Sequence, residues 1–226
     1  MRNTLRPLVA ELVGTFFLVF AGVGAIVSET YRSGTVGFVG IALAHGVALA
    51  IGISATMSVS GGHLNPAVTV GLLSVGRIEV SKAAQYIVAQ LLGATIAVLA
   101  VKGLYPEMAG RIAVYGMPRL AYDVNAIQGI VIEAIMTFML AFAVMGTCVD
   151  PRGPKIGGFG VGLTVFFGIL AGGQMTGGAM NPARAFAPML VGWQWTGWGI
   201  YWVGPILGSV VAMQVYERLL MSKADG

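Results

Sequence analysis

One short pattern occurs twice in this chain, and it restricts the possible folds more than any other feature. A Gly-Gly pair, two further residues and Asn-Pro-Ala appear within residues 60–67 and again within residues 176–183. The two triplets are Asn65, Pro66 and Ala67, and Asn181, Pro182 and Ala183. Asparagine is a favoured N-cap, and proline is favoured at the first helical position because its missing N–H costs nothing there. Each copy therefore predicts the start of a helix.

The helix that follows the first copy is too short to cross a membrane. Its apolar run from Pro66 to Val75 is about 10 residues, or roughly 15 Å at the rise of an α-helix. That length is about half of a hydrocarbon core roughly 30 Å thick. We therefore expect two half-helices that enter from opposite faces of a membrane and meet by their N-termini near its middle.

The composition is that of an integral membrane protein. The 226 residues are 57% hydrophobic and 10% charged, with a mean hydropathy of +0.84, whereas soluble domains carry about 25% charged residues. We predict six spans, at about residues 8–27, 36–59, 83–104, 126–148, 156–175 and 197–220. Residues 105–125 are expected to form a long polar outer loop. The single Cys148 and two histidines argue against an intramolecular disulfide and against a metal cluster, so no metal and no cofactor is expected.

The placement of the basic residues predicts the orientation in the bilayer. Six spans put both termini on one side, which would hold eight basic residues, against four on the other side. The eight are Arg2, Arg6, Arg77, Lys82, Arg152, Lys155, Arg218 and Lys223, and the four are Arg32, Lys102, Arg111 and Arg119. The positive-inside rule makes the termini cytoplasmic, and we expect the plasma membrane of the cell. The basic residues are not clustered, so no nucleic-acid partner is expected.

The two halves of the chain repeat. Residues 10–16 match residues 132–138, which aligns Glu11 with Glu133. We interpret residues 1–226 as a single domain made of repeat one, about 1–104, and repeat two, about 126–226. Three spans per half is an odd number, so the second half must insert upside down. Inverted repeats of this kind place a substrate path at the repeat interface near the midplane, with broken helices around it.

The paired Asn-Pro-Ala motifs, each preceded by Gly-Gly and embedded in matching apolar halves, resemble the aquaporin (major intrinsic protein) family over nearly the full chain length. The resemblance implies an all-α membrane protein, a right-handed bundle of six transmembrane helices plus two re-entrant half-helices. It also implies a passive channel rather than an enzyme, a homotetramer in the lipid bilayer, and one pore per subunit.

Asn65 and Asn181 are the expected pore asparagines. As N-caps, their side-chain oxygens accept bonds from their own half-helices, which turns each amide N–H₂ toward the lumen. Two such donors hold a water oxygen and leave that water no acceptor to which it could pass a proton. The helix N-termini add roughly half a positive charge each and disfavour cations. The alternative is a pair of ordinary capped helices.

Four residues form the selectivity filter that the family resemblance implies: His45, Ile169, Gly178 and Arg184. A charge within a span, as at Arg184, is a functional hypothesis by default. This set resembles the plant vacuolar-membrane aquaporins that also pass ammonia, so we expect water conduction with some ammonia flux. The alternatives are a snorkelling arginine at position 184 and a histidine at position 45 that only bonds neighbouring helices.

Glu11, Glu133 and His63 are interpreted as structural support for the re-entrant loops. Irregular backbone inside a membrane needs internal hydrogen-bond partners, which buried carboxylates can supply. The alternative for the two glutamates is a proton relay.

Two other transport functions compete with a water channel. Glycerol channels of the family commonly carry Asp after the filter arginine and two aromatic filter residues, whereas Ala185 follows Arg184 here, and Ile169 and Gly178 are not aromatic. Gly178 nevertheless leaves space for small neutral solutes. A secondary transporter also shows inverted repeats, but coupling needs titratable or cation-ligating groups at the midplane, and only the two glutamates are candidates.

Overall fold

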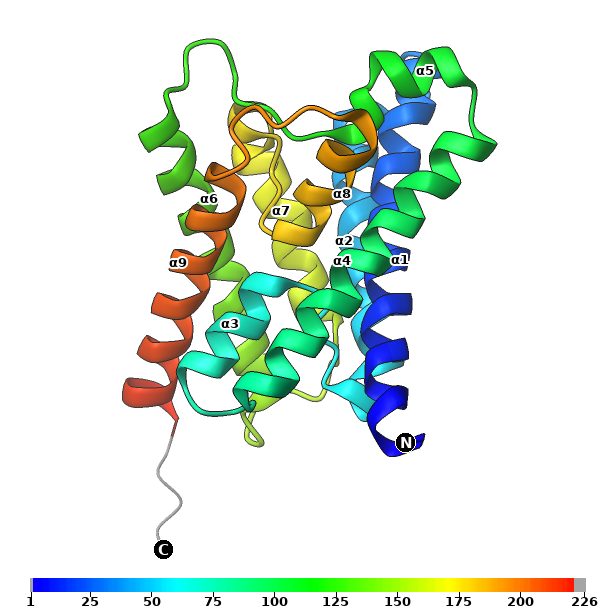
Figure 1. Ribbon diagram of the computed structural model, residues 1–226. Helices are drawn as coiled ribbons and strands as arrows, with labels where there is room; N and C mark the ends of the chain where they lie inside the picture. The colour runs from blue at the N-terminus through cyan, green and yellow to red at the C-terminus, as the bar shows by residue number, and fades with distance from the viewer. Residues whose placement is uncertain (1, 222–226) are drawn as a thin grey trace, which may run out of the picture.

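The computed structural model describes residues 2–221, and the side chains of residues 5–221. Within that range the chain is helical and contains no β-strand. Six long helices form the bundle (Figure 1): α1 (Arg2–Tyr31), α2 (Gly37–Ser60), α4 (Val80–Leu104), α6 (Ala126–Val144), α7 (Phe159–Thr176) and α9 (Ile200–Val215). Lys223 and the side chain of Arg2, which contribute to the predicted charge bias, lie outside the described residues.

Two short helices lie among the six long ones. Helix α3 (Pro66–Ser74) and helix α8 (Pro182–Gly192) occupy opposite halves of the bundle (Figure 1). Helix α3 packs against α9 and helix α8 packs against α4, so each short helix contacts the last long helix of the other half of the chain. The predicted six spans and two half-helices are confirmed.

Five of the described helices are long and apolar enough to cross a membrane. The sixth, α9, has 16 α-helical residues and continues through five residues of π-helix, Tyr216–Leu220. Together they reach roughly 30 Å at about 1.5 Å per residue, which is the thickness of a hydrocarbon core. Helix α6 is likewise extended by a π-helical turn, Met145–Val149.

The outer surface of the bundle is apolar, as a lipid-facing surface must be. On α2 the exposed residues recur every four positions: Val39, Leu43, Val47 and Ile51. The opposite face of the same helix buries His45 and Leu49. The chain is therefore an integral membrane protein.

Equivalent contacts recur in the two halves. The Tyr86 hydroxyl donates to the Ser60 carbonyl at 2.8 Å, and the Tyr201 hydroxyl donates to the Thr176 carbonyl at 2.8 Å. Close helix crossings repeat as well: a methyl group at Gly93 would overlap the Leu12 carbonyl, and one at Gly208 would overlap the Ala134 carbonyl. Small residues of this kind let membrane helices approach closely.

The segment predicted as a polar outer loop is partly helical. It contains α5 (Glu107–Ile112) and a 3₁₀ turn at Val114–Gly116. An ion pair between Glu107 and Arg111, at 2.6 Å, spans one turn of α5, and Tyr115 is buried in the core. The segment therefore folds back onto the bundle because it carries an apolar anchor, which its overall polarity conceals.

The π-helical extensions of α6 and α9 lie close together at the end of the bundle where α1 begins. The Arg152 guanidinium donates to Asp150 at 2.6 Å and to the Leu220 carbonyl at 2.7 Å. The Tyr216 hydroxyl donates to the same Asp150 oxygen at 3.1 Å. Asp150 and Arg152 thus tie the turn after α6 to the extension of α9.

This tie predicts a pH dependence at the end of α9. The Arg152 side chain and its backbone N–H hold the pKa of Asp150 well below its usual range. The tie therefore contributes stability above about pH 4, the usual aspartate value, and loses it as the pH falls through the lower folded-state pKa. After correction for intrinsic rates, we expect amide exchange in residues 216–220 to accelerate only below about pH 4.

The Asp150→Asn variant should show the faster exchange already at pH 7. Glu107→Gln, which removes an ion pair in α5, is the matched control and should leave residues 216–220 protected. Equal protection of these residues in Asp150→Asn and the unaltered chain would contradict the role given to the tie.

Candidate functional site

The two Asn-Pro-Ala triplets begin α3 and α8, as the sequence predicts. The Asn65 side-chain oxygen accepts from the backbone N–H of Ala67 at 2.8 Å. The Asn181 oxygen accepts from Ala183 at 3.0 Å and from Arg184 at 3.3 Å. Both asparagines have extended backbone and act as N-caps for helices with proline in the first position.

The amide nitrogens of the two asparagines cross between the repeats. Asn65 Nδ2 donates to the Met180 carbonyl at 2.8 Å, and Asn181 Nδ2 donates to the Leu64 carbonyl at 2.9 Å. Each bond uses one of the two amide hydrogens. The expectation that both hydrogens face the lumen is therefore wrong for one of them, and a single N–H per asparagine is left for a solute.

The residue before each asparagine has left-handed backbone. Leu64 has φ of 50° and Met180 has φ of 49°, a conformation that costs a branched or bulky residue on the order of 1–3 kcal/mol. Their N–H groups donate to Glu11 and Glu133, respectively, at 2.7 Å. The two buried carboxylates thus hold the turns that aim the Leu64 and Met180 carbonyls at the opposite asparagines.

Glu11 is fully buried and accepts hydrogen bonds from one loop and from two helices, α2 and α4. Besides Leu64, it accepts from the Ser60 hydroxyl at 2.6 Å, the His63 N–H at 2.9 Å and Gln90 Nε2 at 2.7 Å. Both carboxylate oxygens are bonded within the protein, an arrangement that supports the loop rather than a path for protons.

Glu133 occupies the equivalent place in repeat two and is also fully buried. Besides Met180, it accepts from the Thr176 hydroxyl at 2.6 Å and the Ala179 N–H at 2.9 Å. These bonds reproduce those that Glu11 makes with Ser60 and His63. Serine and threonine at equivalent positions therefore perform the same task in the two loops.

Repeat one carries a polar extension that repeat two lacks. Gln90 Nε2 bridges Glu11 and the Thr69 hydroxyl, the latter at 3.0 Å. Because Thr69 donates to the Asn65 carbonyl, it accepts from His63 Nδ1 at 3.1 Å. His63 therefore carries its proton on Nδ1, and its other nitrogen is left as an acceptor.

Gln90 is not among the residues predicted for the site, although a comparison of the two repeats could have found it. If Tyr86 is aligned with Tyr201, Gln90 falls opposite Pro205. If Asn65 is aligned with Asn181, Thr69 falls opposite Ala185, and His63 falls opposite Ala179. The detectable pattern is that three polar residues of repeat one align with proline or alanine in repeat two.

His45 and Arg184 meet on the outer side of the asparagine pair. His45 Nδ1 lies 2.8 Å from the Ile41 carbonyl, an acceptor only, so Nδ1 carries the proton and Nε2 is the acceptor. Arg184 Nη2 lies 3.4 Å from His45 Nε2, and Nη1 donates to the Gly116 carbonyl at 2.8 Å. Within residues 5–221, Arg184 Nε is buried and has no hydrogen-bond partner.

A narrow cavity joins the predicted filter to the asparagines. Its lining includes His45, Asn65, Gly178, Asn181 and Arg184. The cavity volume is about 10 Å³, which is close to the minimum of roughly 10–15 Å³ that holds one water molecule. The cavity therefore has room for about one water-sized molecule.

Ile169 is the one predicted filter residue that does not line this cavity. It is buried and lies against Gly178, where a methyl group would come within 3.1 Å of Ile169 Cγ1. Gly178 has φ of 58°, a backbone conformation that favours glycine. Ile169 thus backs the glycine wall of the cavity.

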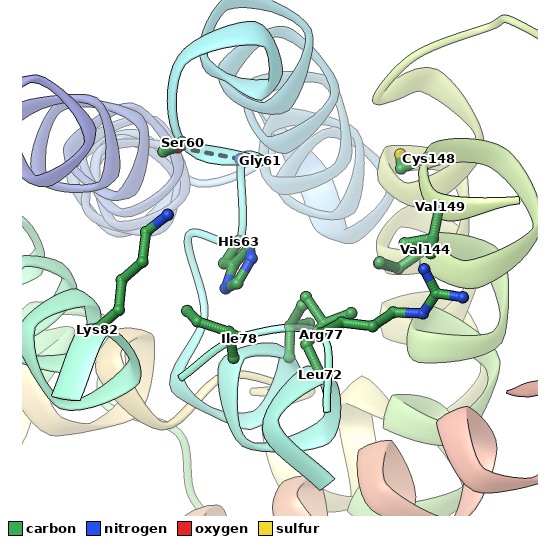
Figure 2. A pocket seen from close by; sticks show the side chains of 12 residues that line it. Ser60, Gly61, His63, Leu72, Arg77, Ile78, Lys82, Val144, Cys148 and Val149 are labelled. Atoms are coloured by element: carbon green, nitrogen blue, oxygen red, sulfur yellow. Dashed lines mark hydrogen bonds between the residues drawn. The ribbon is translucent and has the colours of Figure 1, made fainter. Parts of the chain in front are cut away.

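A wider vestibule opens on the other side of the asparagines, at the end of the bundle where α1 begins. Its volume is about 280 Å³, and its lining includes His63, Arg77, Lys82 and Cys148. Figure 2 shows the His63 ring in this space between Lys82 on one side and Arg77 on the other. The vestibule has a far larger volume than the cavity of about 10 Å³, so the tighter of the two spaces is the one between His45 and the asparagines.

Two half-helices that meet inside a six-helix bundle, with a one-water cavity at their junction, define a passive membrane channel. The model of the major intrinsic protein family matches residues 1–216. The chain therefore belongs to the major intrinsic protein, or aquaporin, family and is not an enzyme.

Relatives and a solved structure agree with this assignment. Aquaporin TIP4-4 of Zea mays is 44% identical over 229 residues, covering 97% of this chain and 88% of that protein. Probable aquaporin TIP3-2 of Arabidopsis thaliana is 40% identical, covering 99% and 86%. The X-ray structure of the aquaglyceroporin from Plasmodium falciparum superposes with a TM-score of 0.84 at 28% identity, covering 96% of this chain and 97% of that one.

Proposed function

We propose that this channel conducts water and ammonia and excludes protons and ions. The one-water cavity bounded by His45, Asn65, Asn181 and Arg184 is the observation that carries this proposal. Hydrogen-bond donors line it from the two asparagines and the arginine, and the acceptor nitrogen of His45 faces Arg184. A small neutral molecule with a lone pair therefore finds hydrogen-bond donors along this cavity.

Three features support exclusion of ions. The cavity is too small for a hydrated ion, so an ion would have to shed its water shell. The N-termini of α3 and α8 converge on the asparagines and present roughly half a positive charge each. The buried guanidinium of Arg184 adds a full charge beside the cavity.

The character of the filter walls supports ammonia as a second solute. One wall is polar, formed by His45 and Arg184, and the other is the small Gly178 backed by the apolar Ile169. A filter with polar groups on every side replaces the hydrogen bonds that water loses on entry, and it therefore favours water. An apolar wall reduces that preference, and ammonia is a neutral molecule of similar size.

The charge pattern supports the orientation that we propose, and the family resemblance supports the proposed assembly. We place the chain in the plasma membrane with cytoplasmic termini, so the vestibule around His63 faces the cytoplasm. Helix α1 begins and the extension of α9 ends at the same end of the bundle (Figure 1), which suits that orientation. We treat residues 1–226 as one channel domain of two repeats, and the assembly as a homotetramer.

Glycerol facilitation is the second candidate, and it is favoured by one observation. The structure matches an aquaglyceroporin with a TM-score of 0.84, and Gly178 leaves one side of the filter open. Against it, the cavity volume of about 10 Å³ corresponds to about one water molecule, and glycerol is a much larger molecule than water. Coupled transport is disfavoured because every oxygen of Glu11 and Glu133 is bonded to a loop donor.

Liposome measurements with filter variants test the proposal. Purified protein should give fast osmotic shrinkage and fast internal alkalinisation in an ammonium gradient, without glycerol uptake above protein-free vesicles. His45→Phe and Ile169→His should each lower ammonia flux about tenfold, a barrier increase of roughly 1.4 kcal/mol, while water flux changes by less than about threefold.

Leu43→Phe is the matched control, because it adds the same ring to the outward face of α2, and both fluxes should be unchanged. Fast shrinkage without alkalinisation above protein-free vesicles would reject ammonia as a solute and keep the water channel.

A further inference from the structure

A glycine on α1 forms the floor beneath the His45 ring. Gly22 is buried, and it lies one turn beyond Leu18, which lines the same narrow cavity as His45. A methyl group at Gly22 would overlap three ring atoms of His45, namely Nε2, Cδ2 and Cε1. The imidazole therefore occupies the space that any side chain at position 22 would need.

Both nitrogens of the His45 ring lie within reach of a neighbouring polar group. Its Nδ1–H is bonded to the Ile41 carbonyl at 2.8 Å, within its own helix. Its Nε2 lies 3.4 Å from Arg184 Nη2. A methyl at Gly22 would push on the edge of the ring that carries Nε2, so the ring would shift toward the cavity of about 10 Å³, and its bond to Ile41 would be distorted or lost.

Other glycines of α1 do not have this relation to the cavity. A methyl at Gly14 would meet the end of the flexible Leu64 side chain, and one at Gly24 would meet the Tyr105 hydroxyl. Only at Gly22, among the glycines of α1, is the neighbour a side chain of the predicted filter.

We propose that Gly22 is a positioning residue of the filter: its missing side chain seats the His45 ring against α1 and thereby sets the open width beside Arg184. This role rests on the proposed channel function of His45 and Arg184. It assigns to α1 a share in selectivity, although no α1 residue is part of the predicted filter.

The test compares Gly22→Ala with a control and a rescue variant in liposomes. Gly22→Ala should lower water and ammonia flux about tenfold or more, because a displaced ring occludes a one-molecule passage. Gly103→Ala is the control, since a methyl at Gly103 meets no atom within 4 Å, and its fluxes should be unchanged. Gly22→Ala combined with His45→Ala should restore water flux, because the obstructing ring is gone.

An NMR measurement that does not depend on solute flux tests the position of the His45 ring separately from the channel function. The chain has two histidines, so a His63→Gln background leaves His45 as the only source of imidazole ¹⁵N signals. In Gly22→Ala the Nδ1 signal should shift as the bond to Ile41 changes, whether or not any solute is conducted. Gly103→Ala in the same background should leave the signal in place.

Three results would overturn the proposal. One is an unchanged Nδ1 signal in Gly22→Ala. Another is unchanged flux in Gly22→Ala when the unaltered protein conducts. The third is a failure of His45→Ala to rescue flux in a folded double variant, which would make Gly22 a helix-packing residue. An unaltered protein that conducts nothing, with the signal shift present, would reject the channel function and keep Gly22 as the seat of His45.

Discussion

Replacing Glu133 with glutamine is expected to reduce the yield of folded protein severely, and to do so more than it changes the selectivity of any protein that survives. Glutamine keeps the size of the side chain but replaces one acceptor oxygen with an N–H₂ group. That group would face one of the three donors that Glu133 now satisfies, from Thr176, Ala179 and Met180. A buried donor without a partner costs about 1–3 kcal/mol, and charge-assisted bonds are lost as well.

This loss is large against the total stability of a typical protein, on the order of 5–15 kcal/mol. The substitution also weakens the support of Met180, whose N–H donates to the carboxylate and whose backbone is left-handed. The measurement is the monodisperse fraction and thermal midpoint of Glu133→Gln in detergent. We expect Glu11→Gln to behave in the same way, because Glu11 holds Leu64 equivalently.

Glu29→Gln is the matched control for the buried glutamates. Glu29 also accepts three backbone N–H bonds, from Gly34, Val36 and Gly37, at 2.6–2.8 Å. It lies at the outer end of α1, where water can replace a lost bond, so we expect only a small effect. If Glu133→Gln were as stable as Glu29→Gln but altered proton flux, the relay interpretation of the glutamates would replace the structural one.

The Arg184→Val variant is expected to admit solutes that the unaltered channel rejects. The guanidinium fills the side of the cavity between His45 and Gly116, and valine removes both its bulk and its charge. A cation that passes 4 Å from a unit charge meets a barrier of about 4 kcal/mol at an effective dielectric constant of 20. Removing the charge therefore lowers the cation barrier substantially.

We expect glycerol flux in Arg184→Val liposomes to rise about tenfold, with a measurable cation conductance, while water flux changes by less than about threefold. Arg119→Val is the control. Arg119 is exposed and donates to Gln194 at 2.9 Å, away from the cavity at the asparagines, so its removal should change none of these fluxes. Unchanged glycerol and cation exclusion in Arg184→Val would show that the filter lies elsewhere.

The architecture could be predicted from the sequence because its determinants are local. Hydropathy locates the spans, and the Asn-Pro pair locates each half-helix to within a residue or two, since capping chemistry acts on the next turn. The odd number of spans per repeat then requires inversion. The helices predicted at residues 36–59 and 126–148 are found at Gly37–Ser60 and Ala126–Val149, including the π-helical turn.

The contacts that fix the predicted site could not be predicted in the same way, because they join distant parts of the chain. Asn65 and Met180 are 115 positions apart, and no periodicity encodes their bond. The bond from Arg184 to the Gly116 carbonyl depends on how residues 105–125 fold back, and that segment is held by the burial of a few residues, among them Tyr115 and Met117. The role of Gly22 depends on an absent side chain, and composition does not distinguish it from the other glycines of the spans.

The reciprocal amide bonds between Asn65 and Met180 and between Asn181 and Leu64 have a consequence for biosynthesis. A ribosome adds about 5–20 residues per second, so the partner of Asn65 is synthesised on the order of 10 s after Asn65 itself. During that interval the first re-entrant helix waits in the membrane without α9, the helix on which it will pack. Insertion of the first three spans therefore leaves α3 without this partner, and we expect the two halves to complete their packing together, late in translation.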